Sequence, residues 1–135
     1  MTTKELEREI WEYTHRQGAM GCFEVTIGWN GSERVDYMTY NYKDEFRCYE
    51  IKISKSDFHS RNRNTFVGHY NYFVLTQELY EKIGNLIPRR IGVYVGGRGL
   101  VVKPQRQELK ADYEVLKNSL LRSLSREFDK HMARG

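Results

Sequence analysis

The 135-residue sequence contains little cysteine, little proline and no long hydrophobic stretch. Two cysteines, Cys22 and Cys48, are too few for a disulfide scaffold or a cysteine-rich zinc site. No apolar run approaches the roughly 20 residues that span a bilayer, and the segment MTTKELEREI lacks the apolar region of a secretory signal. With only two prolines there is no long linker. We therefore expect a single domain, residues 1–135, in a reducing cytoplasmic setting without membrane contact.

The charge of the chain is mildly basic. Lysine and arginine number 22 against 18 aspartates and glutamates, which gives a net charge of +4 and an isoelectric point near 9.1. This balance permits a polyanionic partner without requiring one, because the distribution of charge matters more than its sum.

Hydrophobic periodicity and turn residues predict a chain in which strands and helices alternate. An opening helix precedes three strands, and the second half adds further strands, short helical segments and a long amphipathic helix. This order predicts an α/β fold with a mixed central β-sheet flanked by helices. The expected helices are 3–17, 56–58, 77–83 and 107–131, and the expected strands are 22–29, 34–42, 46–54, 70–76, 91–95 and 100–103.

The third expected strand carries two charged side chains in its interior. Glu50 and Lys52 fall on one face of this strand together with Cys48, and Ile51 and Ile53 fall on the other. Strand interiors disfavour glutamate and lysine. The pair is therefore a candidate functional site.

The preceding strand supplies a third charge, Asp36. If a three-residue loop, 43–45, joins the two strands, Asp36 lies opposite Lys52 and diagonal to Glu50, and all three share a face. Two such carboxylates can hold one hard cation such as Mg²⁺, and a lysine beside them can position a water or stabilise developing negative charge. The alternative interpretation is an exposed sheet face with a cross-strand salt bridge between Asp36 and Lys52.

The acid-x-Lys pattern is common by chance and occurs twice in this chain. Besides Glu50-Ile-Lys52, it is found at Glu108-Leu-Lys110. The second copy lies in an expected helix, where residues two apart diverge, and no strand acid precedes it. Only the first copy is retained as a candidate.

These residues carry a resemblance to a known superfamily. Glu7 on the opening helix, Asp36 on a strand and Glu50-Ile-Lys52 on the next resemble the pattern of the PD-(D/E)XK nucleases, whose fold is that of the restriction endonucleases. The segment EIKISKSDF, residues 50–58, followed by an aromatic strand at 70–75, is similar to the MmcB-like DNA repair family, which has many phage-borne relatives. Two departures are Val35, where proline often precedes the aspartate, and the lack of a Lys-Trp-aromatic segment after Phe58.

The resemblance implies a metal-dependent DNA endonuclease of repair, recombination or phage DNA processing, in the cytoplasm of a bacterium or a phage-infected cell. It implies that Asp36, Glu50 and Glu7 bind Mg²⁺ or Mn²⁺, with Glu9 as the rival of Glu7, and that Lys52 orients the attacking water or neutralises the phosphate. The alternative is a catalytically inactive module of the same fold that binds DNA or a protein partner.

The basic segment after the third strand is the expected DNA contact. Its candidate residues are Lys55, Ser56, His59, Arg61 and Arg63. Related nucleases cut two strands as dimers, whereas no heptad or apolar patch in this sequence marks a dimer face. Both a monomer and a homodimer therefore stay open.

Overall fold

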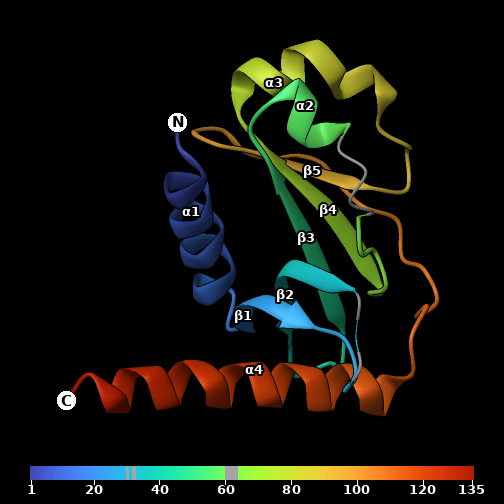
Figure 1. The fold of residues 1–135 in the computed structure, drawn as a ribbon. Coiled ribbons are helices and arrows are strands. Elements are labelled where there is room, and N and C mark those ends of the chain that lie inside the picture. The colour runs from blue at the N-terminus through green and yellow to red at the C-terminus, as the bar shows by residue number, and fades with distance from the viewer. Residues whose placement is uncertain (30, 32, 60–63) are drawn as a thin grey trace.

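The structure is a computed structural model that describes residues 1–29, 31, 33–59 and 64–135. Strands and helices alternate along the chain (Figure 1). The elements in order are α1 (Thr3–Arg16), β1 (Met20–Thr26), β2 (Arg34–Tyr40), β3 (Phe46–Lys52), α2 (Lys55–Phe58), β4 (Tyr70–Leu75), α3 (Gln77–Ile83), the 3-10 turn η1 (Gly84–Leu86), β5 (Gly92–Val95), β6 (Gly99–Val102) and α4 (Tyr113–Ala133).

The strands form one six-stranded sheet in the order β1-β2-β3-β4-β5-β6. The pairs β1–β2, β2–β3 and β5–β6 are antiparallel, and the pairs β3–β4 and β4–β5 are parallel. The expected α/β architecture with a mixed sheet flanked by helices is therefore confirmed.

Helices cover both faces of the sheet. Alternate residues of β3 separate the two faces: Tyr49 and Ile51 pack in one cluster with Leu6 of α1, whereas Cys48 packs in another with Leu120 of α4. Residues of β4 and β5 on the second face pack against α3. Side chains of β3 therefore point either toward α1 or toward α3 and α4, which fixes the direction of the charged residues.

Local capping explains where the first and last helices begin. Thr2 and Glu5 form a capping box at the start of α1, with the Glu5 N–H donating to Thr2 Oγ1 at 3.1 Å. The long C-terminal helix begins at Tyr113, six residues later than expected, because the Asp112 carboxylate caps it. The expected start at residue 107 is wrong because the backbone of 107–110 instead donates hydrogen bonds to residues 67–69.

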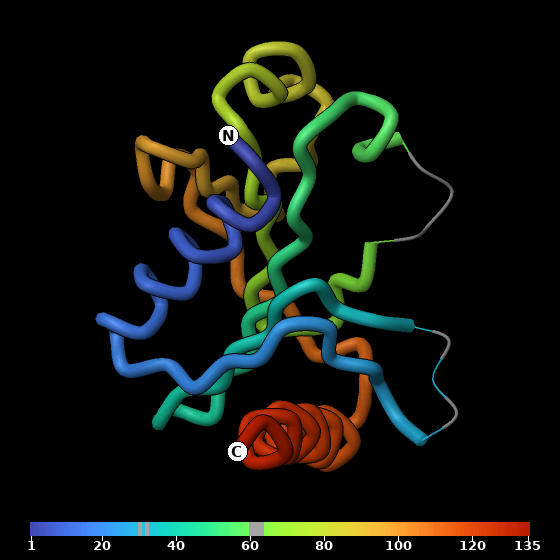
Figure 2. The backbone as a smooth tube through the Cα atoms, turned by 60° about the vertical axis from the view of Figure 1, so that its left-hand side comes forward, coloured from blue at the N-terminus to red at the C-terminus, as the bar shows by residue number. Residues whose placement is uncertain are grey.

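The outer edge of β1 is covered by arginines from α4. Arg126 donates to the carbonyl oxygens of Phe23 and Glu24 at 3.1 Å each, and Arg122 donates to that of Gly28 at 3.0 Å. Figure 2 looks close to the axis of α4 and shows the β1–β2 hairpin running above it. The carbonyl oxygens of Phe23 and Glu24 in this edge strand are therefore satisfied by side chains.

In the part of the chain that the structure describes, no helix has both the length and the apolar character needed to cross a bilayer.

Candidate active site

The structure brings Asp36 and Glu50 together at the ends of two neighbouring strands. The β2–β3 ladder pairs Tyr40 with Phe46 and Tyr37 with Tyr49, so the next residues in register are Asp36 and Glu50. The connecting loop spans five residues, 41–45, and the expected three-residue loop is wrong. Because the register shifts by two residues, Asp36 lies opposite Glu50 instead of Lys52.

The longer loop follows from Asn41. Its side-chain oxygen accepts the N–H groups of Lys43 at 3.0 Å and Glu45 at 3.2 Å. Asp44 adopts a φ of +60°, the left-handed conformation that aspartate tolerates better than most residues. Asn41 thus closes the loop through its own side chain, which sets the register of the strands that follow.

Where β2 and β3 separate, two carboxylates take the place of the backbone carbonyls that would accept hydrogen bonds between the strands. The Ile51 N–H donates to Asp36 Oδ2 at 2.9 Å, and the Asp36 N–H donates to Glu50 Oε2 at 3.3 Å. The second Glu50 oxygen accepts the Thr65 N–H at 2.6 Å. Backbone amides therefore hold both carboxylates in place.

The environment of Glu50 disfavours its negative charge. Burial raises the pKa of this carboxyl to about 8, helped by the adjacent charge of Asp36 and by the hydrogen bond that protonated Glu50 makes with Asp36. The amides of Thr65 and Asp36 oppose this rise without cancelling it. A buried carboxyl beside a second carboxylate is the electrostatic condition that a bound cation relieves.

Glu7 approaches Asp36 from α1. Burial raises the pKa of Glu7, and the charges of Glu24 and Asp36 raise it further. Glu50 shares the Cys48 side of β3 and so points away from α1, whereas Glu7 reaches the strands from the α1 side. Asp36 is therefore the residue that both other acids face.

The rival acid on the first helix is engaged elsewhere. Glu9 Oε1 accepts hydrogen bonds from Gly97 N–H at 2.7 Å and Tyr94 Oη at 3.1 Å. Both partners lie at the β5–β6 end of the sheet. Of the two acids, Glu7 is the one whose pKa is raised by the charge of Asp36.

Sequence reasoning missed a further acid, Glu24 of β1. The β1–β2 register pairs Phe23 with Tyr37 and Val25 with Val35, so Glu24 falls opposite Asp36. Glu24 is exposed and has a φ of +54°, unusual for a residue within a strand. The sequence did contain a signal for this acid: like Glu50, Glu24 is a charged residue in the interior of an expected strand, between Phe23 and Val25.

Lys52 is 7% exposed, and no carboxylate of the described residues lies within 4.0 Å of its ammonium. The alternative of an exposed face with an Asp36–Lys52 salt bridge is therefore not what the structure contains, since Glu50 is also only 3% exposed. Among the described residues, no carboxylate therefore competes with an anion for the Lys52 side chain.

A metal ion would have two ready ligands here. Among the residues described, no three His, Cys, Asp or Glu side chains are arranged to hold a metal ion. The chemistry of the Asp36–Glu50 pair nevertheless fits a hard divalent cation, because both are oxygen ligands and a cation would offset both causes of the raised pKa of Glu50, its burial and the adjacent charge of Asp36.

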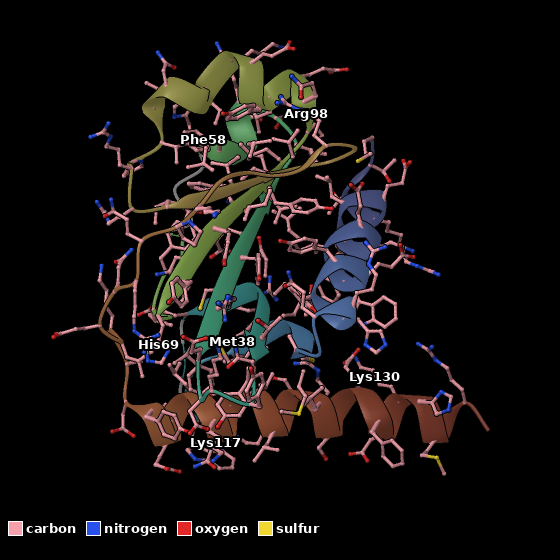
Figure 3. All side chains as sticks on the ribbon, turned by 180° about the vertical axis from the view of Figure 1, so that it is seen from behind. Met38, Phe58, His69, Arg98, Lys117 and Lys130 are labelled. Carbon is pink, nitrogen blue, oxygen red and sulfur yellow. The ribbon has the colours of Figure 1, made fainter. Side chains whose placement is uncertain are left out.

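The expected DNA contacts lie on and after α2. Lys55, Ser56 and His59 are exposed, and Arg61 and Arg63 fall outside the described residues. Ser54 caps α2 by accepting the Asp57 N–H, and Phe58, labelled beside α3 in Figure 3, anchors it with its ring 5.2 Å from that of Phe73. Because β3 leads directly into α2, Lys55, the first of these candidates, lies three positions after Lys52.

One histidine near the sheet has a structural task. His69 (Figure 3) accepts the Phe46 N–H on Nδ1 at 3.0 Å, and burial is the main cause of its lowered pKa. The His69 ring thus satisfies the backbone N–H of Phe46, the first residue of β3.

No protein-family model matches the chain, and no curated protein sequence matches it. Among solved structures, the chain is similar to the SPO1766 protein of unknown function from Silicibacter pomeroyi, with a TM-score of 0.77. The similarity covers 95% of this chain and 89% of that one, at 19% sequence identity. At this identity, the likeness concerns the fold alone.

Proposed function

We propose that this chain is a metal-dependent DNA endonuclease of the PD-(D/E)XK type, similar in its motif to MmcB-like proteins and acting in DNA repair, recombination or phage DNA processing. The observation that carries the proposal is the contact between half-buried Asp36 and buried Glu50 where β2 and β3 separate, with a buried Lys52 two residues after Glu50. If these charges had only a structural role, we would expect Lys52 to form a salt bridge with Asp36 or Glu50, and it forms none with the described residues.

Asp36 and Glu50 would hold Mg²⁺ or Mn²⁺, with Glu7 nearest to them from α1. A divalent cation bound there supplies positive charge to the phosphate oxygens and lowers the pKa of a water molecule. Asp36 and Glu50 are held by backbone amides, so little reorganisation is needed when the substrate arrives.

Lys52 would act on the phosphodiester itself. In phosphodiester cleavage, negative charge grows on the phosphate oxygens, and a nearby ammonium stabilises it. Its burial strengthens this effect because water screens the charge poorly there. Lys52 would either stabilise this charge or orient the attacking water.

The exposed residues of α2 would contact the DNA backbone. Lys55 and His59 can approach phosphates as cations, and the hydroxyl of Ser56 can donate to a phosphate oxygen. Their position immediately after the Glu50-Ile-Lys52 strand supports this role, because contacts there would lie next to the reacting phosphate.

The direct test is nicking of supercoiled plasmid DNA in the presence of Mg²⁺ or Mn²⁺. We expect cleavage by the wild type and a loss of about 100-fold or more in Glu50→Ala, because one of the two ready metal ligands is removed. Glu108→Ala is the matched control, since it alters the exposed acid of the second acid-x-Lys pattern. Equal cleavage by the wild type and Glu50→Ala would refute the proposal.

Glu7 and Glu9 offer a second comparison on one helix. Glu7→Gln is expected to reduce nicking about 10-fold or more, because it removes the α1 carboxylate beside Asp36. Glu9→Gln, which changes only the group bonded to Tyr94 and Gly97, is expected to cleave at the wild-type rate. Cleavage rates measured at saturating Mn²⁺ would decide between them, and the reverse order would assign the site to Glu9.

A second candidate is an inactive module of the same fold that binds DNA or a protein partner. The lack of a three-residue metal-holding group among the described residues favours it. Calorimetry separates the candidates: salt-sensitive DNA binding without Mn²⁺ binding would favour the inactive module.

A further inference from the structure

A large aromatic side chain stands exposed at the turn between β1 and β2. Trp29 is 81% exposed, although tryptophan normally buries most of its surface. It follows the strand that carries Glu24 and precedes the strand that carries Asp36. Glu24 and Trp29 are five residues apart, so the chain between them spans at most about 16 Å.

The exposed ring is held from one side. The Arg122 guanidinium lies 4.0 Å from the centroid of the Trp29 ring. Arg122 is itself fixed, because it donates to the Gly28 carbonyl oxygen at 3.0 Å, and Ser119 Oγ accepts the Gly28 N–H at 2.9 Å. A helix thus supports the turn, and Arg122 packs against one face of the ring while most of the ring surface stays in solvent.

Arg122, which packs against the Trp29 ring, also brings a positive charge to it. No carboxylate of the described residues lies within 4.0 Å of the Arg122 guanidinium, whereas Arg126 one turn further on pairs with Glu127. An aromatic ring backed by an unneutralised cation suits a ligand that combines a flat π-face with a nearby negative charge. A nucleotide has both.

From this geometry we infer that Trp29 is a stacking platform for an unpaired nucleobase, and that the DNA substrate therefore contains a single-stranded segment. The inference rests on the proposed nuclease function and specifies its substrate class. Inside a duplex, each base face is covered by its neighbours, so an interior paired base cannot lie against Trp29. Stacking there would place single-stranded DNA along the β1–β2 hairpin, on the way to Asp36.

The test is binding of a 12-nucleotide oligothymidine in EDTA, which prevents metal-dependent cleavage. Trp11→Phe leaves Trp29 as the one tryptophan, and we expect its fluorescence to be quenched on binding. Trp29→Ala is expected to weaken this binding about 5- to 100-fold, the usual effect of losing one stacked base, while binding of a blunt 12-base-pair duplex is unchanged.

Tyr42→Ala is the matched control. Tyr42 is 85% exposed and has a cation, Lys43 Nζ, 5.7 Å from its ring centroid, but it lies in the loop at the other end of β2. It should bind oligothymidine as the wild type does. Thermal unfolding of both variants checks that each is folded, and Trp29→Phe, which keeps a ring, should retain most of the affinity.

Three results would overturn the inference: an unquenched Trp29, a Trp29→Ala affinity within twofold of the wild type, or an equal loss on the blunt duplex. None of these depends on cleavage. Quenching without metal-dependent cleavage of either the plasmid or a duplex with a single-stranded segment would refute the nuclease and leave the stacking site standing, whereas cleavage without quenching would refute only the stacking site.

Discussion

Replacing Lys52 with methionine is expected to lower the rate of metal-dependent nicking by about 100-fold or more while leaving Mn²⁺ binding intact. Methionine keeps an unbranched apolar side chain in this buried position and removes only the ammonium. Losing one preorganised charge at a reacting oxygen typically costs about 100- to 1,000-fold in rate. Nicking assays and Mn²⁺ calorimetry on the same preparation would measure both quantities.

Lys110→Met is the control for this variant. Lys110 belongs to the second acid-x-Lys pattern and is exposed, so its loss should alter neither quantity. Should Lys52→Met cleave DNA within about threefold of the wild type, the lysine would have no part in the reaction. If Lys52→Met instead loses Mn²⁺ binding, the role of Lys52 would be to position the carboxylates of Asp36 and Glu50.

The second large effect expected is a pH-dependent stability in the metal-free protein. The pKa of Glu50 is about 8 in the folded chain against an ordinary value of 4.5, so folded protein binds this proton more tightly than unfolded protein. The free energy of unfolding should therefore fall as pH rises between these two values, by a few kcal/mol. In EDTA we expect the Tm at pH 8.5 to lie about 5–10 °C below that at pH 6.

Glu50→Gln isolates this contribution, because it has no proton to lose and should flatten the pH profile. His69 acts in the opposite direction, since its lowered pKa makes the folded protein less stable at low pH, and it is present in both proteins. Mn²⁺ should raise the Tm of the wild type more at pH 8.5 than at pH 6, where the proton competes with the metal. Identical pH profiles for the wild type and Glu50→Gln would contradict the assigned environment of Glu50.

Much of the fold could be predicted because hydrophobic period and turn residues act locally. The short helix at 77–83 was expected with the bounds that the structure gives, and β2 and β3 were expected from their first residues. The predicted C-terminal helix began too early because Leu109 fits the hydrophobic stripe of the helix. The backbone of residues 107–110 instead donates hydrogen bonds to residues 67–69. This contact joins segments that are distant in the sequence, so no local pattern predicts it.

The closeness of Asp36 and Glu50 was predictable from the sequence, but their register was not. With any odd-numbered loop, Asp36 falls opposite an even-numbered residue of β3, so a wrong loop length still brought Asp36 and Glu50 near each other. Which residue stands opposite Asp36 depended on how Asn41 closes the turn. Glu24 was missed because its position beside Asp36 requires the β1–β2 register and an unusual backbone conformation.

The arginines that α4 places along β1 also limit how this molecule can assemble. An incoming strand would need the same carbonyl oxygens that Arg122 and Arg126 already occupy, so two copies cannot extend their sheets through this side without displacing both side chains. β6 is the opposite border of the sheet. A continuous sheet shared between two copies would therefore be built through β6, which leaves the β1–β2 hairpin accessible in each copy.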